Sequence, residues 1–99
     1  MEIRIQAIRF DASQQLEDFI QKKVTKLDKY HDGIISTEVV LKVVKPETAK
    51  NKNASIKVNV SGQDFFAEKV SDSFEESVVE GVEAIEKQLM KFKEKQRNK

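Results

Sequence analysis

Lysine side chains are the groups in this sequence best placed to do chemistry, because they recur at helical spacing in two stretches. At about 100° per residue each set falls on one face of a helix, at about 220–280° in the first and about 220–300° in the second. The two sets are Lys22, Lys26 and Lys29, and Lys87, Lys91 and Lys95. Lys23 falls inside the apolar arc of the first helix, so we expect its stem on the core edge and its ammonium reaching outward. Rows of ammonium groups are typical contacts for nucleic-acid phosphates.

Catalytic chemistry has little support in the sequence. The chain contains one histidine, His31, and no cysteine, so it has no thiolate nucleophile and no cysteine metal site. His31 stands beside Asp32 at a predicted helix end, where a surface histidine near the helix dipole is the better interpretation. The sequence has no glycine-rich phosphate loop. We therefore expect no enzyme, no cofactor, no bound metal and no small-molecule substrate.

Composition narrows the possible partners. A chain of 99 residues is one domain, here 1–99, with residues 96–99 expected as a frayed basic tail. Its 18 basic and 17 acidic residues give a net charge of +1, so only the distribution of charge can favour nucleic acid. No apolar run approaches the roughly 20 residues of a membrane span, and the N-terminus lacks a signal-peptide pattern. We expect a soluble, cytoplasmic protein that is not attached to a membrane.

The first third of the chain predicts a strand followed by a helix. Ile3, Ile5 and Ala7 alternate with polar residues, as in a half-buried strand. Ile8 and Phe10 have the opposite parity, so the strand is either buried on both sides near its end or shifted by a bulge.

The first helix carries its apolar face at positions three and four apart. This face consists of Leu16, Phe19, Ile20, Val24, Leu27 and Tyr30. Asp11 with Gln14 has the form of a capping box, so the helix should start at Asp11 or Ser13. Gly33 should end it in the left-handed conformation.

Three strands and a long helix are predicted for the rest of the chain. The strands are residues 34–45, with one parity running from Ile35 to Val43, then 54–60 and 64–70. Residues 45–53 form a mobile hairpin loop and residues 61–64 a short turn. The last helix, from Ser71 to about Gln96, should be capped by Ser71 or Asp72, with glutamates in its first half and lysines in its second.

The resulting order, β-α-β-β-β-α, defines an α+β fold. The helical crossover should make the first two strands parallel, and the short connections should make the others antiparallel. We expect a four-stranded mixed sheet with two parallel helices packed on one face, like a double-stranded-RNA-binding domain. Parallel helices place both lysine stripes at one end of the domain, and their rotation favours a broad basic surface over a narrow channel. The alternative is that these lysines complement the helix dipoles and form pairs such as Asp18–Lys22 and Glu83–Lys87.

Three short motifs resemble the ribosome hibernation promoting factor family, which includes ribosome-associated inhibitor A. KLDKY at residues 26–30 is similar to a K-L-E-K-aromatic helix end, and IEKQLMK at residues 85–91 is similar to an L-E-R-Q-L-x-K motif. SDSF at residues 71–74 resembles the start of the family's second helix. The resemblance covers nearly the whole chain and implies the same β-α-β-β-β-α fold. It indicates a short, sigma-54 modulation protein-like form without the second domain that pairs ribosomes in long members.

The resemblance implies a bacterial stationary-phase and stress factor that blocks translation by occupying the A and P site channel of the 30S subunit. The basic residues that it places on 16S rRNA are Lys23, Lys26, Lys29, Lys87 and Lys91. Lys22 and Lys95 are added by stripe geometry alone. Two other functions stay open: a protein-interaction or stress module that uses the acidic part of the last helix, and a generic double-stranded RNA binder. The oligomeric state is also open, with a monomer favoured.

Overall fold

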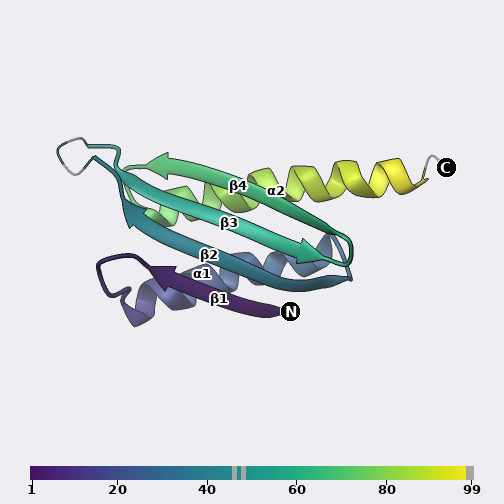
Figure 1. The fold of residues 1–99 in the computed structure, drawn as a ribbon, viewed down its shortest axis with the longest axis horizontal. Helices are drawn as coiled ribbons and strands as arrows, with labels where there is room; N and C mark the ends of the chain where they lie inside the picture. Colours follow the sequence, from purple (N-terminus) through teal and green to yellow (C-terminus); the bar gives the residue numbers. More distant parts are fainter. Residues whose placement is uncertain (46, 48, 98–99) are drawn as a thin grey trace.

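The four strands and two helices of the predicted order are all present in the computed structural model, which describes residues 1–45, 47 and 49–97 (Figure 1). A short 3₁₀ helix, η1, follows the first α-helix. In chain order the elements are β1 (Glu2–Ala7), α1 (Gln14–Thr25), η1 (Lys26–Lys29), β2 (Ile34–Val43), β3 (Lys52–Val60), β4 (Gln63–Ser71) and α2 (Phe74–Arg97).

The strands form one mixed sheet in the order β1-β2-β3-β4. The β1–β2 pair is parallel, and the β2–β3 and β3–β4 pairs are antiparallel, which confirms the predicted α+β topology. Both helices cover the same face of the sheet and run in the same direction, so their C-terminal halves point to one end of the molecule (Figure 1). The last turns of α2 extend past the β3–β4 turn at that end.

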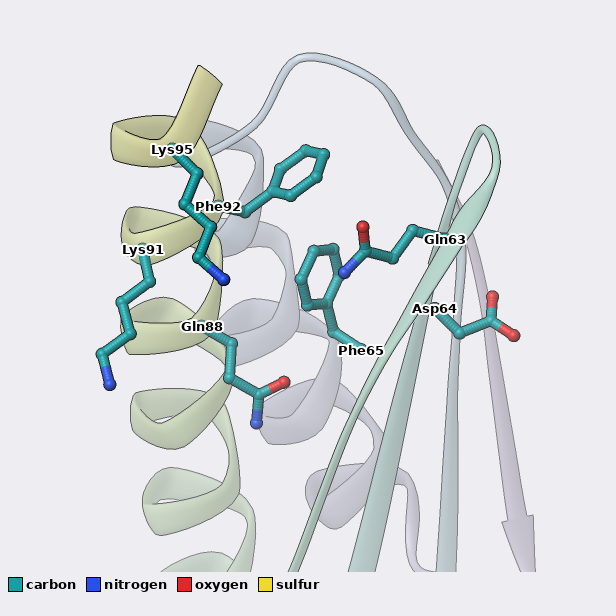
Figure 2. Close-up of a pocket in the computed structure, with 7 residues that line it drawn as sticks. All are labelled: Gln63, Asp64, Phe65, Gln88, Lys91, Phe92 and Lys95. Carbon is teal, nitrogen blue, oxygen red and sulfur yellow. The ribbon is translucent and has the colours of Figure 1, made fainter. Parts of the chain in front are cut away.

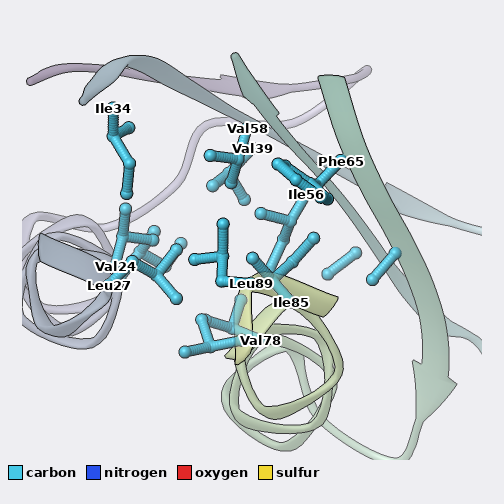
Figure 3. Close-up of a cluster of buried hydrophobic side chains, with 14 of the residues drawn as sticks. Val24, Leu27, Ile34, Val39, Ile56, Val58, Phe65, Val78, Ile85 and Leu89 are labelled. Carbon is cyan, nitrogen blue, oxygen red and sulfur yellow. The ribbon is translucent and has the colours of Figure 1, made fainter. Parts of the chain in front are cut away.

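The core lies between the helices and the sheet, and it determines how each helix is rotated (Figure 3). Aliphatic side chains from one stripe of each helix meet alternate residues of the central strands. Fully buried members are Ile20, Val24 and Leu27, then Val39, Leu41, Ile56 and Val58, and Val78, Ile85 and Leu89. Burial of each such side chain contributes about 1.5–3 kcal/mol. Because these stripes must face the sheet, the lysines of both helices are held on the flanks and the outer surface.

The end of β1 follows neither of the two predicted alternatives. The strand pairs in constant register as far as Ala7, and Ile8 stays on the surface with 38% exposure. Arg9 then adopts a left-handed conformation with φ of 65°. This turn returns Phe10 to the helical layer, where its ring stacks on Phe74 at 5.1 Å. A single left-handed residue, and not a bulge, therefore changes the parity.

A bulge occurs in β2 instead, where none was predicted. The register with β3 shifts between Ile34 and Ser36, so Ile34 is buried and Ile35 is 55% exposed. The prediction that one parity continues from Ile35 to Val43 is wrong at Ile35, whereas the register continues without a shift from Ser36 to Val43.

The start of α1 is capped by Ser13, one of the two predicted residues. The Ser13 hydroxyl accepts a hydrogen bond from the Leu16 backbone N–H at 3.1 Å. The predicted capping box of Asp11 and Gln14 is wrong, because the Gln14 side chain donates to Asp18 at 2.9 Å.

The end of the first helix was also predicted incorrectly. The α-helix ends at Thr25 and continues as η1, whose tighter winding changes the direction of its side chains. Gly33 was expected in the left-handed conformation, yet the glycine with positive φ in the described part of the chain is Gly62, at 83° in the β3–β4 turn. The Gly33 N–H donates to Nδ1 of His31 at 2.8 Å.

The start of α2 is capped by Ser73, and neither of the predicted residues is the cap. The Ser73 hydroxyl accepts a hydrogen bond from the Glu76 N–H at 3.1 Å. Ser71 has a different role, because its hydroxyl donates to the carboxylate of Glu80 at 2.9 Å. Asp72, the other candidate, is exposed.

Two segments predicted as irregular are partly regular. Lys52, placed in the hairpin loop by the sequence, begins β3 and pairs with Val43. Residues 46 and 48 of that loop lie outside the described residues, as do residues 98 and 99 of the predicted tail. The backbone of α2 continues through Arg97, one residue past the predicted end.

Candidate nucleic-acid interface

The predicted lysines all lie on the helical layer, and six of them belong to the end where α2 extends past the sheet (Figure 1). Lys87 lies near the middle of α2, in a depression that it lines with Lys69, Glu80 and Glu83. Lys23 is half-buried, and the others are exposed: Lys22, Lys26, Lys29, Lys87, Lys91 and Lys95. The predicted clustering at one end is therefore present for six of the seven and not for Lys87, and the two groups face different directions.

The first group is divided between two types of helix. Lys22 and Lys23 belong to the last turn of α1, whereas Lys26 and Lys29 belong to η1. Side chains three residues apart eclipse each other in a 3₁₀ helix, so Lys26 and Lys29 project in nearly the same direction. The predicted stripe assumed an unbroken α-helix. After Lys22 it is replaced by the pair Lys26 and Lys29, which project in nearly the same direction.

Lys23 is held against an aromatic ring beside the second helix. Its Nζ lies 5.4 Å from the centroid of the Phe19 ring, a cation–π contact worth about 0.5–1 kcal/mol at an exposed site. Phe19 in turn lines a shallow groove with Val79 of α2. The predicted position of its stem at the edge of the core agrees with its half-buried side chain.

The second group faces the β4 flank of α2, away from α1. Lys91 and Lys95 line a pocket together with Phe65 of β4 (Figure 2). Lys87 lines a neighbouring depression with Lys69, which also belongs to β4. The two predicted groups therefore form a broad basic surface around one end of the helical layer.

Lys93 is a candidate that the sequence reasoning did not select. It lines a small cleft with Lys29 and His31, between α2 and the segment after η1. Lys93 thereby connects the first lysine group with the end of α2. The sequence could have indicated Lys93 by its position on the helical wheel, at about 100° from Phe74 and on the flank opposite to the selected stripe.

The lysines of this surface are not neutralised by neighbouring carboxylates. None of the seven lies within 4.0 Å of a carboxylate of any described residue. The expected pairs of Asp18 with Lys22 and of Glu83 with Lys87 are thus not formed, and Asp18 accepts from Gln14 instead. These ammonium groups remain available to an external anion.

All the acidic residues of α2 except Glu94 lie in its other half. Glu75 and Glu76 lie in the first turn, where the helix dipole favours negative charge. Glu80 is engaged by the hydroxyl of Ser71. A helix of 24 residues is about 36 Å long, so most of the glutamates are well removed from Lys91 and Lys95.

The surroundings of His31 are those of a structural residue. Its Nδ1 accepts the hydrogen bond from Gly33, and its ring lies 5.8 Å from that of Phe92. Within the described residues, no three side chains of histidine, cysteine, aspartate or glutamate gather as a metal site would require. No helix in that part of the chain is long and apolar enough to cross a membrane.

Comparison with known proteins gives a match along nearly the whole chain. The model of a family described as sigma 54 modulation protein / S30EA ribosomal protein matches residues 3–97. A ribosome hibernation promoting factor from Azotobacter vinelandii is 27% identical over 96 residues, which cover 97% of this chain and 86% of that protein.

Two solved structures are similar in fold to this chain. The N-terminal domain of Protein Y from Thermus thermophilus has a TM-score of 0.81 and 25% identity, covering 93% of this chain and 99% of that one. A ribosomal subunit interface protein from Coxiella burnetii has a TM-score of 0.83 and 25% identity, covering 94% and 98%. The order of strands and helices and the whole lysine surface fall within the family match.

Proposed function

The chain belongs to the sigma 54 modulation protein / S30EA ribosomal protein family, and from this membership we propose that it is a ribosome-binding hibernation factor that inhibits translation. Membership in a family of ribosomal proteins confirms the prediction that the chain is not an enzyme. The family match over residues 3–97 is the observation that carries the proposal. Residues 1–99 would act together as one ribosome-binding domain in the bacterial cytoplasm.

The proposed partner is the small ribosomal subunit. The names of the relatives point to it, since one is a hibernation promoting factor and another a subunit interface protein. We propose that the protein lies in the A and P site channel of the 30S subunit under stress or in stationary phase. Occupancy of that channel would exclude tRNA and mRNA, which requires no chemical step.

The lysine surface supplies the proposed contacts with 16S rRNA. A protein bound to RNA gains affinity when each ammonium neutralises a phosphate and releases a counterion. The absence of ion pairs at these lysines, within the described residues, supports this role, because no internal pair must be broken first. A broad surface also fits a folded rRNA better than a single row of charges, since several strands can be contacted at once.

Cosedimentation with 30S and 70S particles at two salt concentrations tests the proposal. The protein should sediment with the particles at low salt and dissociate as the salt concentration rises. Lys87→Glu combined with Lys91→Glu should weaken binding and reduce the slope of log affinity against log salt by about two units. The control is Lys42→Glu with Lys57→Glu, which makes the same change of charge on the open face of the sheet. Failure to sediment with ribosomes at low salt would contradict the proposal.

The likeness to a double-stranded-RNA-binding domain remains a finer proposal about the kind of RNA. Such domains read the shape of an A-form helix and not its sequence. An excess of an arbitrary RNA duplex should then displace the protein from ribosomes. Retention on ribosomes in the presence of that competitor would favour a site specific to the folded rRNA.

A second candidate function is supported by the groove between the N-terminal halves of the helices. The groove has a volume of about 260 Å³ and an apolar floor of Phe19 and Val79, rimmed by Glu75, Glu76 and Glu80. This chemistry suits a basic protein segment with an apolar side chain. Recovery of one specific protein after nuclease treatment, with no rRNA, would favour this function over ribosome binding.

A further inference from the structure

The pocket between the start of β4 and the C-terminal half of α2 differs from the rest of the lysine surface because it has an aromatic floor (Figure 2). Its volume is about 560 Å³, within the range of sites that hold small organic ligands. A surface that contacts only phosphates needs neither depth nor rings. The pocket therefore suggests a ligand with both a flat apolar part and an anionic part.

The floor consists of Phe65 and Phe92, whose rings pack edge to face. Their centroids are 5.4 Å apart, with an angle of 73° between the ring planes. Phe65 is 6% exposed and supports Phe92 from within the core, while Phe92 is only partly buried and its ring also lies 5.8 Å from that of His31. These contacts hold both rings in place before any ligand arrives. Fixed aromatic side chains of this kind are the surfaces on which unstacked bases rest in proteins that bind single-stranded RNA.

The charges around the pocket are positive because its one carboxylate is turned outward. Asp64 points away from the ring pair (Figure 2). One of its oxygens accepts a hydrogen bond from Asn59 at 2.6 Å, and the other lies 3.7 Å from Nζ of Lys57. The ammonium of Lys95 points toward the space in front of the rings, and that of Lys91 lies farther out on the rim.

Two side-chain amides complete the pocket. The Gln88 amide nitrogen donates to the backbone carbonyl of Phe66 at 2.9 Å, which fixes the amide and leaves its oxygen available as an acceptor. Gln63 extends over the ring of Phe65 from the β4 side (Figure 2). Amides that can both donate and accept are suited to the edge of a nucleobase.

We propose that this pocket binds a single nucleotide. Its base lies against Phe92, which the buried Phe65 supports, the base edge contacts Gln63 and Gln88, and the phosphate lies at Lys95 and Lys91. The shared ligand chemistry has two sources, an unstacked nucleotide of an RNA chain or a free mononucleotide. The RNA source rests on the proposed function, whereas the free mononucleotide does not depend on it.

The test is a titration of the isotope-labelled full chain, followed by amide chemical shifts. The probes are adenosine monophosphate, a single-stranded RNA hexanucleotide, the same hexanucleotide in a duplex, and inorganic phosphate. We expect saturable shifts in β4 near Gln63 and in α2 from Gln88 to Lys95 with the monophosphate or the single strand, and weaker shifts with phosphate. Absence of such shifts with both nucleotide probes would overturn the proposal. Equal shifts with inorganic phosphate would also overturn it, because the site would then bind anions only.

Matched variants separate the pocket from general attraction between charges. Lys95→Ala should weaken binding of the monophosphate about threefold to fivefold, whereas Lys42→Ala, on the exposed part of β2, should leave it unchanged. Equal weakening by both variants would contradict a specific pocket. Gln63→Ala, which removes only the amide, should weaken binding and keep it saturable.

The same titration identifies the source and remains independent of the ribosome assay. Saturation by adenosine monophosphate at a lower concentration than by the single strand indicates a free nucleotide, and the reverse order indicates RNA. If the protein sediments with ribosomes but the pocket responds to no nucleotide, this inference fails and the proposed function remains. If the pocket binds adenosine monophosphate and no ribosome association is found, the proposed function fails alone.

Discussion

The two halves of α2 carry similar numbers of charges but use their polar side chains differently. In residues 74–86 the polar groups are tied into the fold. Ser77 is fully buried, and its hydroxyl donates to the carbonyl of Lys52 at 2.5 Å and also contacts that of Ser73 at 3.1 Å. Glu80 accepts the hydrogen bond from Ser71. This half of the helix is anchored to the start of β3 and to the end of β4.

The lysines of residues 87–95 are not tied into the fold in this way. Lys87, Lys91 and Lys95 are exposed, and none has a described carboxylate within 4.0 Å. The helix dipole explains why glutamates precede lysines. Because it favours the charges at both ends of the helix, it does not account for the difference in their pairing. Both halves support the fold, since Gln88 bonds to the backbone of β4 and Leu89 is fully buried; the halves differ in that the lysines of the second half are exposed and unpaired among the described residues.

Burial of apolar side chains within α2 gives the largest expected effect on stability. Ile85 is fully buried against the sheet, whereas Met90, five residues later, is 51% exposed. We expect Ile85→Ala to lower the free energy of unfolding by about 2–5 kcal/mol, and Met90→Ala to change it by less than about 0.5 kcal/mol. Urea unfolding followed by circular dichroism measures both. Similar losses for the two variants would mean that the exposed side chain of Met90 contributes to packing as much as the buried side chain of Ile85 does.

The buried hydroxyl of Ser77 should have the next largest effect. Ser77→Ala removes the donor that satisfies the Lys52 carbonyl, so we expect a loss of about 1–3 kcal/mol in the free energy of unfolding. Ser61→Ala in the exposed β3–β4 turn is the matched control and should be close to neutral. A neutral Ser77→Ala would show that this bond does not anchor the first half.

The N-cap of α2 gives a smaller effect. Ser73→Ala should cost about 1 kcal/mol of stability, because the Glu76 N–H loses its acceptor. Asp72→Ala should cost less, since Asp72 is exposed and is not the cap. Thermal unfolding of both variants compares the two positions. A larger loss for Asp72→Ala would reverse the assignment of the cap.

The sheet and the order of the elements could be predicted because each strand and helix has a clear period. Strict alternation at Ile56, Val58 and Val60, and helical spacing at Val78, Ile85 and Leu89, leave little choice of face. Turn details could not be read in the same way. The left-handed residue after β1 is Arg9, not a glycine, and arginine carries no signal for that conformation. At the start of α2, three consecutive residues that favour caps made the choice ambiguous.

The positions of the candidate lysines on the two helices could be predicted, but the directions in which they point could not, and their contact with rRNA stays a prediction. A helical wheel assumes an unbroken α-helix, and it fails where α1 changes into η1 at Lys26. A wheel also cannot tell which neighbour lies on each flank. That Lys91 faces β4 while Lys93 faces η1 depends on how the core rotates α2 against the sheet. The paired rings of Phe65 and Phe92 come from elements far apart in the chain, so no local pattern marks them.

Removing one charge from each half of α2 should have the smallest effect on folding. It also tests most directly whether the two halves differ in their contacts with a partner. Lys91→Ala should leave the free energy of unfolding within about 0.5 kcal/mol and lower the salt slope of ribosome binding by about one unit.

Glu76→Ala is the matched variant in the acidic half. It removes one exposed charge and should leave the slope unchanged, because no phosphate contact is gained or lost. Cosedimentation across a series of salt concentrations measures both slopes. If Glu76→Ala strengthens binding as much as Lys91→Ala weakens it, with equal and opposite changes of slope, only net charge matters. The proposal that the lysines in the second half of α2 contact rRNA phosphates would then be wrong.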